Sequence, residues 1–172
     1  MLLGESTCGD DAVRDLRSAR PGSCELFFAE ATGSRLALLA DDVHDHPAWT
    51  FTPVVPLFSG GRGGAAAGDW LFRVGFWLPR EHRAEFLDWY EHEHLPMLLA
   101  CDAWDGCRFV EMRDPGGCRF AALHQLSDAS ALASPERARS RATPWFLRLK
   151  RFEWFDAPFT RTLYRRSTER TA

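Results

Sequence analysis

The segment LFRVGFWL, residues 71–78, carries the pattern that decides the fold. Every second residue from Phe72 onward is apolar, whereas the alternate positions hold the mixed set Leu, Arg, Gly and Trp, which is typical of a β-strand with one wholly apolar face. Pro79 then opens a segment in which apolar and aromatic residues recur every three or four positions up to about His94, as in an amphipathic helix. Pro96 is expected to limit this helix because proline lacks a backbone N–H.

The order of elements after this helix predicts a ferredoxin-like unit. Residues 107–113 and 119–126 are strand candidates, and the sequence DPGG at 114–117 supplies the backbone angles of a tight turn between them. A weak Ser/Ala/Arg-rich helix follows, and Thr143 can cap a further helix whose first position suits the next residue, a proline. Residues 159–165 form the last strand candidate. The resulting order β-α-β-β-α-β is the ferredoxin-like arrangement.

The N-terminal half repeats this arrangement in abbreviated form. Residues 22–28 align with 105–110, and residues 33–39 align with 117–123. The offset stays near 83 residues in both places, as expected for repeated units of one length. The helix candidate of this half is the short segment 10–18. These matches predict an internal duplication.

A glycine-rich run, SGGRGGAAAG from Ser59, reads as a flexible linker between the halves, because no Gly-Lys-Ser/Thr follows that would make it a phosphate loop. The predicted organisation is an abbreviated N-terminal half (1–59), a linker (60–69), a C-terminal half (70–166) and a tail (167–172). Two four-stranded sheets, each covered by helices on one face, are expected to pack sheet to sheet through their mixed faces and to enclose a central cavity. The predicted fold class is α+β.

Composition excludes several classes of protein. The 172 residues are 45% hydrophobic and carry a formal net charge of −3, so we expect a packed core and no extended basic surface for nucleic acid. The five cysteines lack the spacing of a disulfide framework or a zinc site. No signal sequence or membrane-spanning run is apparent, and a cytoplasmic location is expected.

One segment of the predicted helix resembles a known family. FLDWYEHEHLP at 86–96, together with Gly106, TPW at 143–145 and the strand at 159–165, is similar to the EthD-like branch of the dimeric α/β-barrel superfamily. The resemblance covers about residues 70–166, and the N-terminal half lacks the corresponding helix motif. It implies two ferredoxin-like halves joined as a barrel within one chain.

The same resemblance implies a broad range of functions. The superfamily includes polyketide cyclases, cofactor-independent aromatic monooxygenases, isomerases, dehydratases, haem-handling proteins and members without known activity. The leading hypothesis is a cofactor-free enzyme that cyclises, dehydrates or isomerises a small aromatic or polyketide-like substrate. Cofactor-independent oxygenation and noncatalytic ligand binding are the alternatives, and the oligomeric state is left open between a monomer and a homodimer.

Two residues are the first candidates for catalysis. His94 lies on the buried side of the predicted helix, where a neutral imidazole can act as general base; the alternative is a histidine that only bonds a backbone carbonyl at the helix end. Arg73 lies on the mixed face of its strand, beside a glycine that leaves room for a ligand, and can stabilise an enolate. Its alternative role is an ion pair with Glu111 or another acid.

The remaining site candidates are secondary. His124 and Tyr164, on later strands, can form an acid/base pair, although structural packing is the alternative for both. Candidate substrate contacts are Trp77, Trp89, Tyr90 and Glu111. The other tryptophans, including Trp104, are interpreted mainly as packing residues.

No metal site is predicted. His92 and His94 are two residues apart on a helix and therefore point in nearly opposite directions. His44 and His46 lie in a loop, but no third ligand is evident there.

Overall fold

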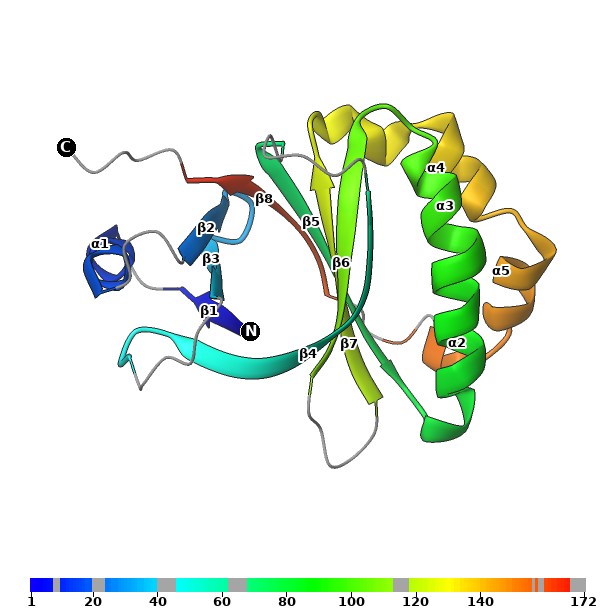
Figure 1. Ribbon diagram of the computed structural model, residues 1–172, viewed down its shortest axis with the longest axis horizontal. Coiled ribbons are helices and arrows are strands. Elements are labelled where there is room, and N and C mark those ends of the chain that lie inside the picture. Colours follow the sequence, from blue (N-terminus) through cyan, green and yellow to red (C-terminus); the bar gives the residue numbers. More distant parts are fainter. Residues whose placement is uncertain are drawn as a thin grey trace.

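Eight antiparallel strands form a closed barrel with helices on its outside (Figure 1). The computed structural model describes residues 1–7, 10–19, 24–39, 46–61, 68–112, 118–155, 157 and 160–167. The strands are β1 (Leu2–Ser6), β2 (Cys24–Ala29), β3 (Ser34–Leu39), β4 (Thr50–Gly61), β5 (Trp70–Leu78), β6 (Trp104–Met112), β7 (Cys118–Leu126) and β8 (Arg161–Arg166). The α-helices are α1 (Asp10–Ala19), α2 (Arg83–Trp89), α3 (Leu95–Leu99), α4 (Pro135–Ser140) and α5 (Pro144–Leu149). A π-helix (Tyr90–His94) joins α2 to α3, and short 3-10 turns span Arg80–His82, Ala129–Ala133 and Glu153–Phe155.

The barrel consists of two sheets with the same internal order. Around the barrel the strands follow the order β1-β3-β2-β8-β5-β7-β6-β4, which divides into β4-β1-β3-β2 and β8-β5-β7-β6, the order of a ferredoxin-like unit. Because β2 pairs with β8 and β4 pairs with β6, the two sheets join at both edges. The predicted fold class is therefore confirmed: the chain is an α+β protein whose two ferredoxin-like halves form one dimeric α/β barrel.

The strands predicted for the C-terminal half are confirmed with small shifts at their ends. Strand β5 contains the alternating segment, and β6 and β7 form the expected antiparallel hairpin. The predicted turn at 114–117 lies outside the described residues. The final strand pairs with β5 and so completes the C-terminal sheet.

Apolar side chains from both halves fill the interior of the barrel. They include Leu3, Phe27, Leu36, Leu38, Leu71, Val110, Leu123 and Tyr164. Strand alternation places them there, because successive residues of a strand point to opposite faces of its sheet. The mixed faces of the two sheets therefore meet through packed apolar side chains in this part of the barrel, and the cavity expected between them stays a prediction.

Charged residues from the two halves pair with each other. Glu25 on β2 lies 2.9 Å from Nη1 of Arg108 on β6 and 3.2 Å from Nη2 of Arg166 on β8. Glu25 and Arg108 are 83 residues apart and hold equivalent positions in the two halves. Arg73 on β5 likewise pairs with Glu5 on β1. The halves thus carry complementary charges at their contact.

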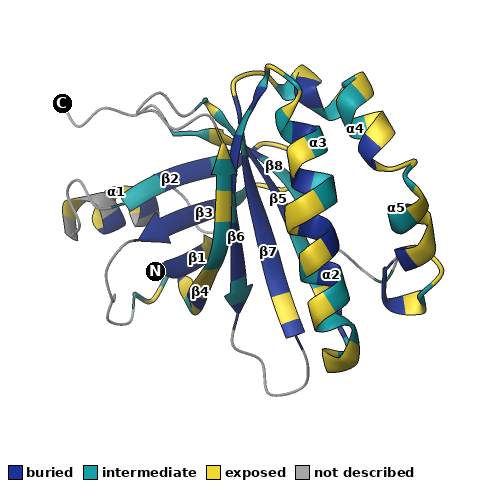
Figure 2. Ribbon diagram, turned by 45° about the vertical axis from the view of Figure 1, so that its right-hand side comes forward, coloured by how far each residue is buried: buried dark blue, intermediate teal, exposed yellow. Residues whose placement is uncertain are grey.

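Helices cover the outer face of each sheet (Figure 2). Val13 and Leu16 of α1 pack with Trp49 over the N-terminal sheet, where the rings of Trp49 and Phe51 are stacked 6.2 Å apart. Helices α2 to α5 cover the C-terminal sheet and form the larger core with its apolar face. Among the described elements, the two outer faces therefore differ, because α1 is the one helix on the first and α2 to α5 cover the second.

The helix after β5 continues past Pro96, contrary to the prediction. Between α2 and α3 the backbone widens into a π-helix, in which the N–H of Leu95 bonds to the carbonyl of Tyr90, five residues earlier. Pro96 follows this turn and occupies the start of α3. A prolyl residue lacks an N–H and is tolerated at the start of a helix, where that donor has no partner within the helix.

Strand β4 extends into the predicted linker. Gly60 and Gly61 pair with Cys107 and Gly106 of β6. Gly61 has a φ of 153°, and a Cβ at this position would lie 2.6 Å from the carbonyl oxygen of Asp105. The close approach of the two strands therefore requires glycine here. Residues 62–67, most of the predicted linker, lie outside the described part of the chain.

Candidate functional site

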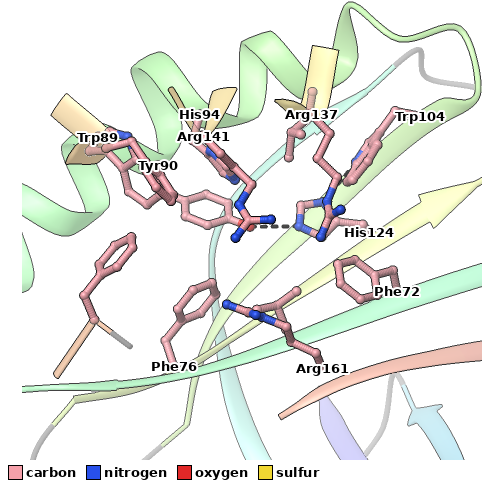
Figure 3. Close-up of a pocket in the computed structure, with 14 residues that line it drawn as sticks. Phe72, Phe76, Trp89, Tyr90, His94, Trp104, His124, Arg137, Arg141 and Arg161 are labelled. Carbon is pink, nitrogen blue, oxygen red and sulfur yellow. Dashed lines mark hydrogen bonds between the residues drawn. The ribbon is translucent and has the colours of Figure 1, made fainter. Parts of the chain in front are cut away.

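A pocket lies between the C-terminal sheet and the helices that cover it, on the outside of the barrel (Figure 3). Its interior has a volume of about 70 Å³, and the space rises to about 630 Å³ when the solvent at its open mouth is included. Its walls are mainly aromatic and include Phe72, Phe76, Trp89, Tyr90, Trp104 and Phe146. Three arginines and two histidines also line it, whereas no aspartate or glutamate of the described residues does so.

Strand β5 and the π-helix build the two sides of this pocket. Phe72 and Phe76 lie on the face of β5 that meets the helices. Tyr90 and His94 face them from the π-helix, with their ring centroids 5.0 Å apart and Phe76 edge-on to Tyr90 at 5.6 Å. π-Helical turns are often found at functional sites. Here the turn presents two polar aromatic side chains to one space.

A chain of hydrogen bonds connects three buried rings at one wall. Nε1 of Trp104 donates to Nδ1 of His124 over 3.0 Å, and Nε2 of His124 lies 2.8 Å from the Tyr90 hydroxyl. Because an indole nitrogen only donates, Nδ1 of His124 carries no proton. A neutral imidazole then holds its proton on Nε2. The His124 ring therefore donates to the oxygen of Tyr90.

Tyr90 consequently directs its own proton into the pocket. Its oxygen accepts from His124, and no described side chain accepts its O–H in return. Burial raises the pKa of Tyr90 well above its usual value, so the hydroxyl stays protonated. Burial, with smaller effects of His94 and Arg137, lowers the pKa of His124 to about 3, so that ring stays neutral. Tyr90 is thus a hydrogen-bond donor available to a ligand.

His94 offers the complementary acceptor. Its ring donates a hydrogen bond to the backbone of Ser140, and its buried Nδ1 has no partner among the described residues. The donating nitrogen is therefore Nε2, and Nδ1 keeps its lone pair. Burial is the main cause that lowers the pKa of His94 to about 4, and Arg141 and Arg137 add to this effect. The ring is neutral near pH 7 and can accept a proton.

Three arginines line the pocket. Arg137 on α4 donates to the carbonyl of Leu132 over 2.5 Å and lies over the ring of Phe72. Arg141, just after α4, lies over the ring of Phe146, and Arg161 begins β8. Within the described ranges neither Arg137 nor Arg141 forms an ion pair with a carboxylate. Burial and the two neighbouring arginines lower the pKa of Arg137.

The structure brings four of the residues predicted from sequence together. His94, Trp89, Tyr90 and His124 all line the pocket. Nε1 of Trp89 is also buried without an acceptor among the described residues, and its ring centroid is 4.6 Å from that of His94.

The other four predicted residues lie elsewhere. Arg73 and Tyr164 are on the opposite face of the C-terminal sheet, where Arg73 pairs with Glu5 and Tyr164 is buried inside the barrel. Trp77 is 47% exposed near the end of β5. Glu111 forms a two-point ion pair with Arg83, at 2.7 and 3.3 Å, outside the pocket. The structure therefore does not bring Arg73 and His94 into one site.

Several pocket residues were not predicted as site residues. Trp104 is a packing residue in the sequence-based interpretation, yet it also sets the proton on His124. Arg137 and Arg141 fall in the weak Ser/Ala/Arg-rich helix. Their spacing of four residues, which places side chains on the same side of a helix, is the signal that could have identified them. No comparable signal marks Arg161.

The described residues contain no group of three or more His, Cys, Asp or Glu side chains that could hold a metal ion. Cys101, Cys107 and Cys118, in the described part of the chain, are free thiols. Among the described helices, none has the length and apolar character needed to cross a membrane. His44 lies outside the described residues, and Nδ1 of His46 accepts from the backbone of Ala48.

Comparison with known proteins identifies the fold through solved structures. No protein-family model matches the sequence, and no curated protein matches it. A monooxygenase-like protein from Listeria innocua is similar with a TM-score of 0.67 and 14% identity, covering 98% of this chain and 95% of that one. An anthrone oxidase-like protein has a TM-score of 0.66 and 9% identity, covering 96% and 90%. A heme-degrading enzyme from Listeria monocytogenes has a TM-score of 0.63 and 12% identity, covering 96% and 99%. At these identities the likeness shows a shared ferredoxin-like barrel fold.

Proposed function

We propose that the protein is an enzyme that removes a proton from a flat aromatic or polyketide-like substrate bound in the pocket on the outer face of the C-terminal sheet. The observation that carries this proposal is that one pocket is lined by a residue with an unpartnered acceptor, His94 with its Nδ1, and by a hydrogen-bond donor, the Tyr90 hydroxyl. Aromatic walls suit a planar ring system held by stacking. This function needs no cofactor for its first step.

In this reaction His94 is the general base. Nδ1 takes a proton from an acidic carbon or hydroxyl of the substrate, and the electron pair of the broken bond moves to a conjugated oxygen. The Tyr90 hydroxyl donates a hydrogen bond to that oxygen as negative charge develops on it. Tyr90 takes the role of oxyanion donor that the sequence suggested for Arg73. Cyclisation, dehydration and isomerisation of an enolate can all proceed from this intermediate.

Cofactor-independent oxygenation is a second candidate, favoured by the names of structural neighbours. One neighbour is described as monooxygenase-like and another as anthrone oxidase-like. In this second reaction the carbanion formed from the substrate transfers electrons to molecular oxygen. A CH2 group becomes a carbonyl, one oxygen atom enters the product and the other leaves as water. Both candidate reactions begin with proton abstraction by His94. Membership of the chain in the EthD-like branch is part of the same proposal.

The test separates proton abstraction from oxygen use. Anthrone, whose CH2 protons are acidic, is incubated with the protein in D2O without oxygen, and exchange of these protons is followed by NMR; oxygen uptake is measured in a parallel aerobic sample. We expect protein-dependent exchange that His94→Ala abolishes. His92→Ala is the matched control, since His92 is exposed on the same helix.

Each outcome has a definite meaning. Exchange without oxygen uptake supports the cyclase, dehydratase or isomerase class, whereas exchange with oxygen uptake supports the oxygenase class. If anthrone and a panel of related phenols and polyketide-like ketones bind but never exchange, the catalytic proposal is wrong. A noncatalytic ligand-binding protein is then the better description.

A further inference from the structure

The charged residues that line the pocket, among those the structure describes, are all arginines. Arg137, Arg141 and Arg161 line it, and no carboxylate of the described residues does. Figure 3 shows the three arginine side chains extending toward the space between the π-helix and the strands. Positive charges placed close together repel one another when no anion is present.

Two of these arginines are held in place by neutral contacts. Leu132 anchors the Arg137 guanidinium through its carbonyl, and Phe72 lies beneath it. Arg141 lies over Phe146. Guanidinium groups fixed in this way keep several N–H donors for a further partner, because Arg has five. A planar carboxylate matches these donors.

We propose that the pocket selects a flat aromatic substrate that carries a carboxylate, with Arg137 and Arg141 binding this group at the mouth while the ring system lies between the aromatic walls. The proposal rests on the proposed function and specifies its substrate class. The carboxylate at the arginines anchors one end of the ligand, and Tyr90 and His94 contact the reacting part deeper in the pocket. Arg137 and Arg141 therefore determine specificity, and they take no part in proton transfer.

The test compares two probes that differ only in charge, 2-naphthoate and 2-naphthamide, by isothermal titration calorimetry. We expect the acid to bind at least about tenfold more tightly than the amide, since a charge-assisted hydrogen bond contributes roughly that factor. Arg137→Gln and Arg141→Gln should each weaken binding of the acid about tenfold and change binding of the amide less than about twofold. Raising the salt concentration from about 0.02 to about 0.5 M should weaken binding of the acid and leave binding of the amide unchanged.

Arg139→Gln is the matched control, because Arg139 lies on the same helix but pairs with Glu136 outside the pocket. It should leave both affinities unchanged. Arg141 is exposed, so we expect Arg141→Gln to fold. This variant tests the inference even if Arg137→Gln does not fold. Equal binding of acid and amide, or equal losses for both in the Arg141 variant, would overturn the inference.

Different results would overturn the carboxylate proposal and the proposed catalytic function. Loss of charge selectivity with proton exchange of anthrone intact would overturn the carboxylate proposal alone. Tight, arginine-dependent binding of 2-naphthoate without proton exchange on any substrate would overturn the catalytic proposal alone.

Discussion

The hydrogen bond from Nε1 of Trp104 to Nδ1 of His124, 3.0 Å long, fixes which nitrogen of this buried ring carries the proton. We expect the Nε2–H tautomer near neutral pH in a nitrogen–proton NMR correlation of the histidine ring. In Trp104→Phe the His124 ring is free to adopt either tautomer. It then no longer holds the Tyr90 hydroxyl as a donor directed into the pocket. Turnover should fall about tenfold, and the unsatisfied nitrogen should cost about 1–3 kcal/mol of unfolding free energy.

Trp154→Phe is the matched control for this change. Trp154 is also buried in the aromatic core, but its Nε1 has no acceptor among the described residues. Its replacement should preserve the His124 tautomer. An Nδ1–H signal in the unmodified protein would contradict the proposed direction of the whole hydrogen-bond chain.

Tyr90→Phe should impair turnover without removing the aromatic packing. Loss of an oxyanion donor lowers kcat by about 100- to 1,000-fold in comparable sites. The ring contacts with Phe76 and Phe109 remain, so the fold should persist. The measurement is steady-state turnover together with thermal unfolding. Tyr164→Phe, at the other tyrosine of the chain, is the control: this residue lies inside the barrel and should keep full turnover.

Acid should destabilise the protein through its buried histidines. The pKa of His94 is about 4 in the folded protein against 6.5 when exposed, so the unfolded state binds more protons below about pH 6.5. The stability contribution of a neutral His94 is present above pH 6.5 and is lost as the pH falls through about 4. This shift corresponds to roughly 3 kcal/mol at most.

Urea unfolding at several pH values checks this dependence. His94→Gln should flatten the loss of stability between about pH 6.5 and 4, and the remainder should come from His124. His92→Gln should retain the dependence of the unmodified protein, because His92 is exposed. An unchanged slope in His94→Gln would show that His94 is not buried as a neutral ring.

Arg73→Met should leave ligand binding and turnover within about twofold of the unmodified values. Arg73 lies on the face of β5 that points into the barrel, and its ion pair is with Glu5. The methionine preserves the length of the apolar stem, and the half-exposed Glu5 carboxylate remains in contact with water. A large loss of turnover, measured with the folded variant, would mean that the barrel interior takes part in the chemistry.

Local patterns in the sequence predicted the elements of the C-terminal half well. The alternation that begins at Phe72 correctly separated the residues of β5 that face the helices, from Phe72 to Leu78, from Leu71 and Arg73 on the other face. It could not decide which face would hold the ligand pocket, because that depends on how tightly each layer packs. The mixed face was expected to line a cavity, yet leucines, Phe27 and Val54 from the other half pack in front of it.

The candidate site was predicted mainly where one helix contributes several residues, and His124 on β7 is the one further residue that was predicted. Tyr90 and His94 are four residues apart, so periodicity placed them on one side. The relation between Trp104 and His124 depends on the pairing of two strands and on a hydrogen bond between side chains distant in sequence. Strand β1 was missed because its short segment lacks a strong alternating pattern, and its place between β3 and β4 is set by long-range pairing.

The pair formed by Glu25 and Arg108 has a consequence for how the two halves can associate. The two residues are 83 positions apart and lie in hydrogen-bond contact. If two identical copies of one half came together in the same way, this position would meet its own copy, and two glutamates or two arginines would repel. Opposite charges are possible here because the two halves differ in sequence. Neither half could therefore form the same pair with a second copy of itself.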